Sequence, residues 1–149
     1  MKDLFIDNNI AIRLANPVTR EYKELVEWLI YNQEAFLVTC NKLIQEYGHS
    51  GAYANSATCI WVILDKLTRE GRRNHISNQS IKSFKQKYYK PHITKCFNCS
   101  SNDRDFIAVI LLSYRKFALI KDNNFKKDVE NFPGFTARVE RRPRDLPYQ

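Results

Sequence analysis

Acidic residues stand beside short apolar segments at four distant points of this sequence. Asp7 and Asp122 each follow an apolar run, and Glu46 lies in the helical segment after another such run. Asp105, with Asp103 close by, falls in the first turn of a strongly apolar helix. If the runs form parallel strands, these acids lie near the carboxyl ends of the sheet, where α/β proteins bind ligands. We therefore expect them to meet in one pocket.

Carboxylates gathered in one pocket have a chemical consequence. Two like charges about 5 Å apart repel by roughly 3 kcal/mol at an effective dielectric constant near 20, so such a group binds protons or a cation. Oxygen ligands without His or Cys favour a hard ion, which makes Mg²⁺ or Mn²⁺ the expected cofactor. Beside a phosphodiester, such an ion activates water and stabilises negative charge on the phosphate. Taken one at a time, each acid is also explained as a helix cap or a solvated strand end.

Apolar runs too short for helices alternate with segments of helical spacing along most of the chain. The expected strands are residues 4–6, 35–38, 93–97 and 117–120, with an edge strand over 135–139. The expected helices are residues 19–32, 41–47, 52–70, 80–89, 103–114 and 125–132. This alternation predicts an α/β protein, a three-layer α-β-α domain with a central, mostly parallel sheet of about 4–5 strands. We expect one domain over residues 1–140 and a basic tail over 141–149.

The charge balance indicates a polyanionic partner. The sequence carries 24 Lys and Arg against 16 Asp and Glu, a formal net charge of +8, and such a balance favours binding to phosphates. No apolar run reaches the roughly 18–20 residues needed to cross a bilayer. The first residues, Met1 to Leu4, do not resemble a cleavable signal peptide. We expect a cytoplasmic protein that has no membrane partner.

A basic segment in the middle of the chain is the candidate nucleic-acid surface. Lysines and aromatic residues interleave there, a pattern that combines phosphate contacts with base stacking. The set is Lys82, Phe84, Lys85, Lys87, Tyr88, Tyr89 and Lys90, with Arg72 and Arg73 preceding it. The alternative is a solvated helix face whose cations near the C-terminus are favoured by the helix dipole.

The cysteines leave two readings open. Cys40 and Cys59 lie in apolar segments that are expected to be buried. Cys96 and Cys99, with His92 before them, supply three of the four ligands of a structural zinc site, and no second pair completes it. We therefore favour reduced, buried or idle thiols over zinc.

Four pieces of the sequence stand in a characteristic order and spacing. They are residues 4–9, 37–46, 103–108 and 118–125. Together they resemble the PIN domain, a family of metal-dependent ribonucleases, over roughly residues 3–139. The resemblance implies that Asp7, Glu46, Asp105 and Asp122 hold Mg²⁺ or Mn²⁺, with Asp103 as a further ligand. It also implies that water attacks an RNA phosphodiester and leaves 5′-phosphate and 3′-hydroxyl ends.

Two residues depart from the PIN pattern. Asn8 stands where Ser or Thr usually follows the first acid, and Lys121 directly precedes the fourth acid, where Ser or Thr is common. We expect Asn8 to orient substrate or metal-bound water, and Lys121 either to contact substrate phosphate or to compete for the carboxylates. Many PIN domains are toxins of toxin–antitoxin pairs and often dimerise, so the resemblance implies an antitoxin protein and a second copy as candidate partners.

The sequence thus supports a Mg²⁺- or Mn²⁺-dependent endoribonuclease as its first functional hypothesis. The second hypothesis is a catalytically silent RNA-binding module with the same fold. The third is a protein-interaction domain whose acids are structural.

Overall fold

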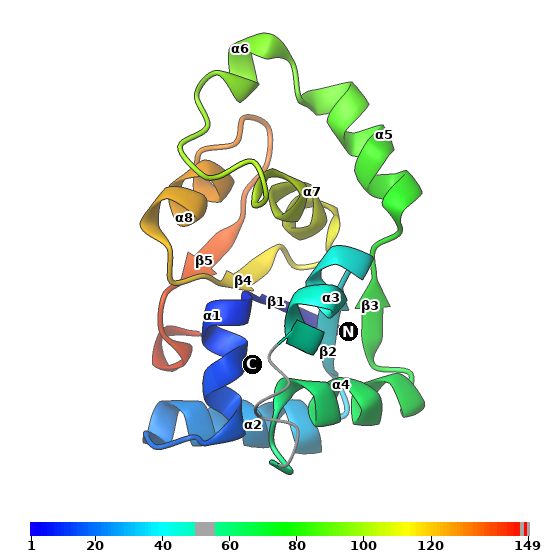
Figure 1. Ribbon diagram of the computed structural model, residues 1–149, viewed down its shortest axis with the longest axis vertical. Coiled ribbons are helices and arrows are strands. Elements are labelled where there is room, and N and C mark those ends of the chain that lie inside the picture. Colours follow the sequence, from blue (N-terminus) through cyan, green and yellow to red (C-terminus); the bar gives the residue numbers. More distant parts are fainter. Residues whose placement is uncertain (50–55, 147, 149) are drawn as a thin grey trace.

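A sheet of five parallel strands forms the centre of the molecule (Figure 1). The structure is a computed structural model and describes residues 1–49, 56–146 and 148. The strands are β1 (Lys2–Ile6), β2 (Ala35–Thr39), β3 (Arg73–His75), β4 (Phe117–Leu119) and β5 (Arg138–Glu140). They lie in the order β3-β2-β1-β4-β5, so β1 occupies the middle of the sheet. The parallel sheet predicted from the sequence is confirmed.

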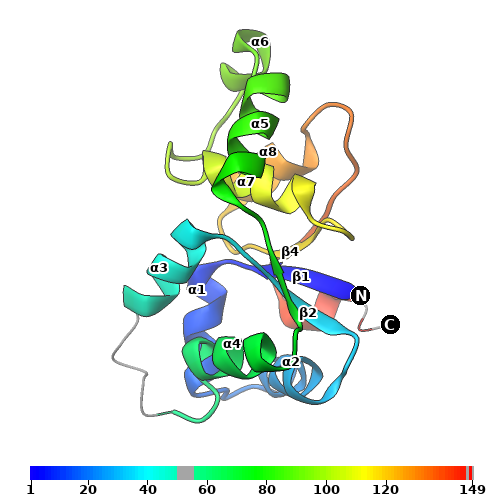
Figure 2. The same cartoon turned by 90° about the vertical axis from the view of Figure 1, so that its right-hand side faces the viewer.

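Helices cover both faces of this sheet, which confirms the three-layer architecture (Figure 2). On one face lie α2 (Arg20–Tyr31) and α4 (Ile60–Arg69). On the other face lie α5 (Asn78–Tyr88), α7 (Arg104–Leu112) and α8 (Asn123–Glu130). Covered on both sides, the middle strand is a continuous apolar run, and Leu4, Phe5 and Ile6 are at most 1% exposed.

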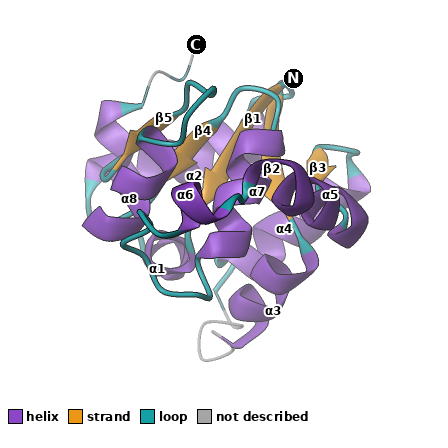
Figure 3. Ribbon diagram, turned by 90° about the horizontal axis from the view of Figure 1, so that it is seen from above, coloured by secondary structure: helices purple, strands orange, loops and turns teal. Residues whose placement is uncertain are grey.

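Short helices lie at the carboxyl edge of the sheet. These are α1 (Asn8–Ala11), with a 3₁₀ turn after it at Ile12–Ala15, and α3 (Asn41–His49). Seen from above, α1 and α3 lie at the edge opposite the N-terminus (Figure 3). Since β1, β2 and β4 all run toward this edge, the residues that follow them come together here.

The strand predicted at residues 93–97 is wrong. Pro91 begins a short helix instead, α6 (Pro91–Thr94), because its fixed φ and missing N–H suit the first helical turn. The strand beside β2 is β3, a polar edge strand that has no apolar alternation to reveal it. The helix predicted over 52–70 is described from Ile60 onward as α4, and residues 50–55 lie outside the described residues.

Two buried charged side chains hold distant segments together. Asp3, which is 0% exposed, accepts hydrogen bonds from the backbone N–H groups of Tyr114 (2.7 Å) and Arg115 (2.8 Å) and from the amide of Asn74 (2.7 Å). The guanidinium of Arg72 donates to several backbone carbonyls around the C-terminus of α2 and the start of β2, and it pairs with Glu70. A carboxylate or guanidinium satisfied in this way is tolerated in a protein interior.

The expected basic tail is packed against the domain where it is described. Pro143–Asp145 form a 3₁₀ turn, and Leu146 is buried. The ring of Tyr148 lies 5.4 Å from that of Trp28 in α2, and Arg142 pairs with Glu21 at 2.9 Å. These contacts fix the segment on the face of the sheet that α2 covers.

Candidate functional site

An acidic cavity of about 270 Å³ opens at the carboxyl edge of the sheet. The name acidic cavity is used below for the space lined by Asp7, Asn8, Asn9, Glu46, His49, Asp103 and Asp122. Four carboxylates from four separate segments therefore meet in one place. This is the arrangement that the strand and helix pattern predicts, except that Asp103 takes the place expected for Asp105.

Asp7 is the most buried acid of the cavity, with 7% of its surface exposed. It directly follows β1, and its backbone N–H donates to the carbonyl of Leu119 at the end of β4 (3.0 Å). The pKa of the Asp7 carboxyl is raised to about 6, mainly by burial and further by the charges of Asp103, Glu46 and Asp122. A backbone N–H bond from Asn8 acts in the opposite direction.

Glu46 is brought to the cavity by the packing of α3. The next residue, Tyr47, is fully buried, and its hydroxyl donates to the carbonyl of Ile6, the last residue of β1. This bond holds α3 against the strand that Asp7 follows. Burial raises the pKa of Glu46, and the charge of Asp103 adds to this effect.

Asp103 occupies the N-cap position of α7, at the end of a loop that is fastened from two sides. The buried carboxylate of Asp128 in α8 accepts two backbone N–H groups of this loop, at 2.8 and 2.7 Å. The hydroxyl of Tyr89 donates to the carbonyl of Arg104. Burial raises the pKa of Asp103, and the charge of Asp122, another acid of the cavity, raises it as well.

Asp122 has two roles. Its Oδ1 caps α8 by accepting the backbone N–H groups of Asn124 (2.8 Å) and Phe125 (3.1 Å). Asp122 is therefore a helix cap, as the alternative explanation from the sequence predicted. The carboxylate also lines the cavity, and its charge raises the pKa of both Asp7 and Asp103.

Asp105, expected among the catalytic metal ligands, lies outside the acidic cavity. It lines a second cavity, where its carboxylate pairs with Lys85 at 2.6 Å and with Lys42 at 3.8 Å. In a helix, residues two positions apart point about 200° away from each other, so Asp103 and Asp105 cannot face the same side. The metal-ligand assignment therefore fits Asp103 better than Asp105.

The fit of the acidic cavity to a metal ion is partial. Its donors are carboxylate and amide oxygens with one imidazole, which suits Mg²⁺ or Mn²⁺. Among the described residues, however, no three His, Cys, Asp or Glu side chains converge closely enough to hold one ion. Burial is the main cause of the raised pKa values of Asp7, Glu46 and Asp103, and the charges of neighbouring carboxylates add to it.

The basic residues expected to bind nucleic acid divide into two groups. Arg72 is 2% exposed, and its guanidinium donates hydrogen bonds to backbone carbonyls. Its assignment to an RNA surface is therefore wrong. Arg73, Lys82, Lys87 and Lys121 are exposed, and Lys85 is half-buried against Asp105. Of these lysines, Lys82 and Lys85 line the second cavity.

The aromatic residues of α5 form a core with α8 and the segments around it. The ring of Phe84 lies 4.6 Å from that of Tyr88 and 5.9 Å from that of Phe132. Tyr89 packs against Phe97 at 5.3 Å. These rings pack against one another at tilted and edge-on angles, and Phe84 is buried, so it offers no surface to a nucleic-acid base.

Two residues of the acidic cavity were missed from the sequence. His49 lies three positions after Glu46 in α3, and helical residues at that spacing share a face, so the signal was present. Asn9 follows Asn8 in α1 and carries no comparable signal. The charge of His49 lowers the pKa of Glu46 and so offsets part of the repulsion there.

The cysteine pair does not assemble a zinc site in the described part of the chain. Cys96 is exposed, whereas Cys99 is buried next to Asp128. Burial raises the pKa of the Cys99 thiol to about 12, and Asp128 contributes to the rise. A thiol of this kind is a poor metal ligand, since the thiolate is the form that binds.

No protein-family model matches this chain, and no curated protein matches it either. Within the described residues, no helix is long and apolar enough to cross a membrane. The function is therefore inferred from the acidic cavity and its surroundings.

Proposed function

We propose that this protein is a PIN-like, Mg²⁺- or Mn²⁺-dependent endoribonuclease that hydrolyses RNA phosphodiesters in the acidic cavity. The observation that carries the proposal is the meeting of Asp7, Glu46, Asp103 and Asp122 in one cavity, where burial and the repulsion between neighbouring acids raise the pKa of Asp7, Glu46 and Asp103. Repulsion of this kind favours a bound cation. The net charge of +8 favours a polyanionic substrate despite this local negative charge.

The carboxylates of Asp7, Glu46, Asp103 and Asp122 would hold the ion. Mg²⁺ binds many proteins through one or two carboxylates, retains several waters and takes its other ligands from substrate phosphates, so it does not need three convergent acids. When bound, the ion supplies a water of lowered pKa and positive charge beside the phosphate. Asn8, Asn9 and His49 also line the cavity, where the two asparagines would orient substrate and His49 would donate a hydrogen bond to a phosphate oxygen.

The test is cleavage of labelled RNA in the presence of Mn²⁺ by the wild-type protein and by Asp7→Asn. The wild type should cut the RNA and Asp7→Asn should not. Because this change relieves repulsion, the variant should be at least as stable as the wild type, so misfolding would not explain its loss of activity. Asp65→Asn, which changes an exposed acid of α4, is the matched control. Intact RNA with both the wild type and the control would refute the nuclease.

A second candidate function is RNA binding without cleavage. The lack of a three-ligand cluster among the described residues favours it. Wild-type protein that shifts RNA in a gel with Mn²⁺ present, and leaves it intact, would support this function. A toxin role with an antitoxin partner remains part of the proposal that the PIN resemblance implies, and a small antitoxin gene next to this one would support it.

A further inference from the structure

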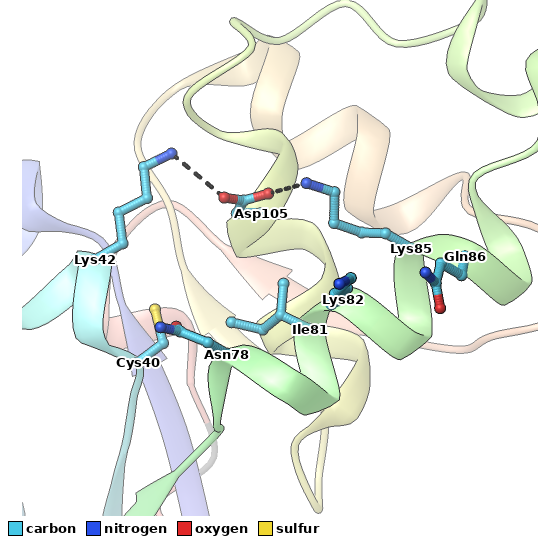
Figure 4. Close-up of a pocket in the computed structure, with 8 residues that line it drawn as sticks. All are labelled: Cys40, Lys42, Asn78, Ile81, Lys82, Lys85, Gln86 and Asp105. Atoms are coloured by element: carbon cyan, nitrogen blue, oxygen red, sulfur yellow. Dashed lines mark hydrogen bonds and ion pairs between the residues drawn. The ribbon is translucent and has the colours of Figure 1, made fainter.

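A second cavity, of about 650 Å³, lies next to the acidic cavity at the junction of β2, α3, α5 and α7. The name basic pocket is used for this space, which is lined by Cys40, Lys42, Asn78, Ile81, Lys82, Lys85, Gln86 and Asp105 (Figure 4). Its volume is within the range of pockets that bind small molecules or parts of larger ligands.

The charges of the basic pocket suit an oxyanion. Figure 4 shows the ammonium groups of Lys42 and Lys85 approaching the carboxylate of Asp105 from opposite sides, at 3.8 and 2.6 Å. Lys82 lines the same space and has no ion-pair partner among the described residues. Three lysines and one aspartate thus line the pocket, so positive charge is in excess. The carboxylate of Asp105 is the anion that Lys42 and Lys85 pair with in this structure.

The remaining walls suit more than a bare phosphate. Cys40 and Ile81 are buried and give the pocket an apolar floor. The amides of Asn78 and Gln86 supply hydrogen-bond donors and acceptors at its wall. An apolar floor with amides and lysines around it matches a nucleotide, whose base is apolar on its faces and polar at its edges.

The basic pocket and the acidic cavity share structural neighbours. Lys42 lies four residues before Glu46 on α3, and its charge lowers the pKa of both Glu46 and Asp103. The ammonium of Lys42 also donates to the carbonyl of Asn102, directly before Asp103 (2.6 Å). One nucleic-acid strand lying across Lys42 would therefore reach both cavities.

We propose that the basic pocket binds one nucleotide of single-stranded RNA, with Lys42, Lys82 and Lys85 on its phosphate. Asp105 is the counter-ion that holds Lys42 and Lys85 until the phosphate replaces it. The choice of RNA rests on the proposed function, whereas the binding itself needs neither metal nor cleavage.

The experiment is fluorescence anisotropy with a short fluorescein-labelled single-stranded RNA in EDTA, at several salt concentrations. The double variant Lys82→Gln/Lys85→Gln should raise Kd by roughly ten-fold, and the slope of log Kd against log salt should fall by about 0.7 for each lost phosphate contact. Asp105→Asn should lower Kd severalfold, since it releases both lysines. The double variant Lys23→Gln/Lys127→Gln, which changes exposed lysines of α2 and α8 outside the pocket, is the charge-matched control. Lys87→Gln tests the same helix outside the pocket.

Several outcomes would overturn the proposal. Equal losses for Lys87→Gln and Lys82→Gln would mean a diffuse basic helix with no pocket. Weaker binding by Asp105→Asn would mean that its carboxylate contacts the RNA or orders the site. Displacement of the RNA by polyglutamate at equal charge concentration would indicate a site for acidic peptides. RNA bound through the pocket and never cut would refute the proposed nuclease alone, whereas RNA cut normally with Kd unchanged in the double variant would refute the pocket alone.

Discussion

The acidic cavity and the basic pocket are neighbours that handle charge in opposite ways. In the acidic cavity, carboxylates face one another and burial raises the pKa of Asp7 to about 6. In the basic pocket, Asp105 is already paired with Lys42 and Lys85. Asp103 in the acidic cavity and Asp105 in the basic pocket both stand at the start of α7. Residue type and position in the sequence therefore do not distinguish their roles. The charges that surround each acid distinguish these roles.

The largest effect expected from this difference is on RNA cleavage. Asp103→Asn should reduce the rate by about 1,000-fold, because it removes an oxygen that faces the proposed metal. Asp105→Asn should leave the rate constant at saturating RNA within a few-fold of the wild type. Single-turnover cleavage in Mn²⁺ measures both. Equal losses in the two variants would show that the cavities form one catalytic site and would break the comparison.

The next largest effect is on stability as a function of pH. The pKa of Asp7 is raised in the folded protein from 3.8 to about 6, so its protonated form favours folding below about pH 4 and this contribution is lost as pH rises through 6. The loss should be about 2 kcal/mol between pH 4 and pH 7. Urea unfolding of the metal-free protein across this range measures it. Asp7→Asn should flatten the dependence, and an equally steep curve in that variant would contradict the assignment.

A divalent metal ion should stabilise the folded protein through the acidic cavity and not through the basic pocket. At a metal concentration of about 100 times Kd, binding adds about 2.7 kcal/mol, which for a chain of this size is a rise of about 5 °C or more in melting temperature. The wild type and Lys82→Gln should both show the rise with Mn²⁺ or Mg²⁺. Asp7→Asn should lose it. A wild-type protein whose melting temperature ignores both ions would remove the metal from the proposed function.

The smallest effect concerns the ion pair of the basic pocket. Lys85 and Asp105 are each about a third or more exposed, so their pair contributes little to folding. Lys85→Gln should change the free energy of unfolding by less than about 1 kcal/mol. Chemical denaturation would measure this change. A larger loss would make the pair a structural element of α5 and α7 and would weaken its role as a displaceable counter-ion.

Much of the fold could be predicted because buried parallel strands are apolar on both faces. β1, β2 and β4 are such runs, and their ends locate Asp7 and Asp122. β3 could not be predicted, because a short polar edge strand has no hydrophobic pattern. The neighbours Arg72 and Arg73 look alike in sequence, yet one is buried and the other exposed, as expected where successive side chains point to opposite sides.

The sequence predicted that acids would meet at the candidate site, but it did not identify every one of those acids correctly. Asp103 and Asp105 both stand at the start of α7, and only the rotation of the helix against the sheet decides which faces the cavity. That rotation depends on contacts made by distant residues, such as the carboxylate of Asp128 and the hydroxyl of Tyr89. No local pattern around residue 103 contains this information.

The bonds of Asp3 have a consequence for the chain as it is being made. The backbone N–H groups that satisfy this carboxylate lie 111 and 112 residues downstream. Before residues 114 and 115 leave the ribosome, burying Asp3 in a partial sheet would cost several kcal/mol, so we expect β1 to take its buried position only after they emerge. Asp122 follows only a few residues later. A nascent chain that lacks residues 103 and 122 is therefore without two of the four acids of the acidic cavity, so we expect this cavity to form only after both residues have been made.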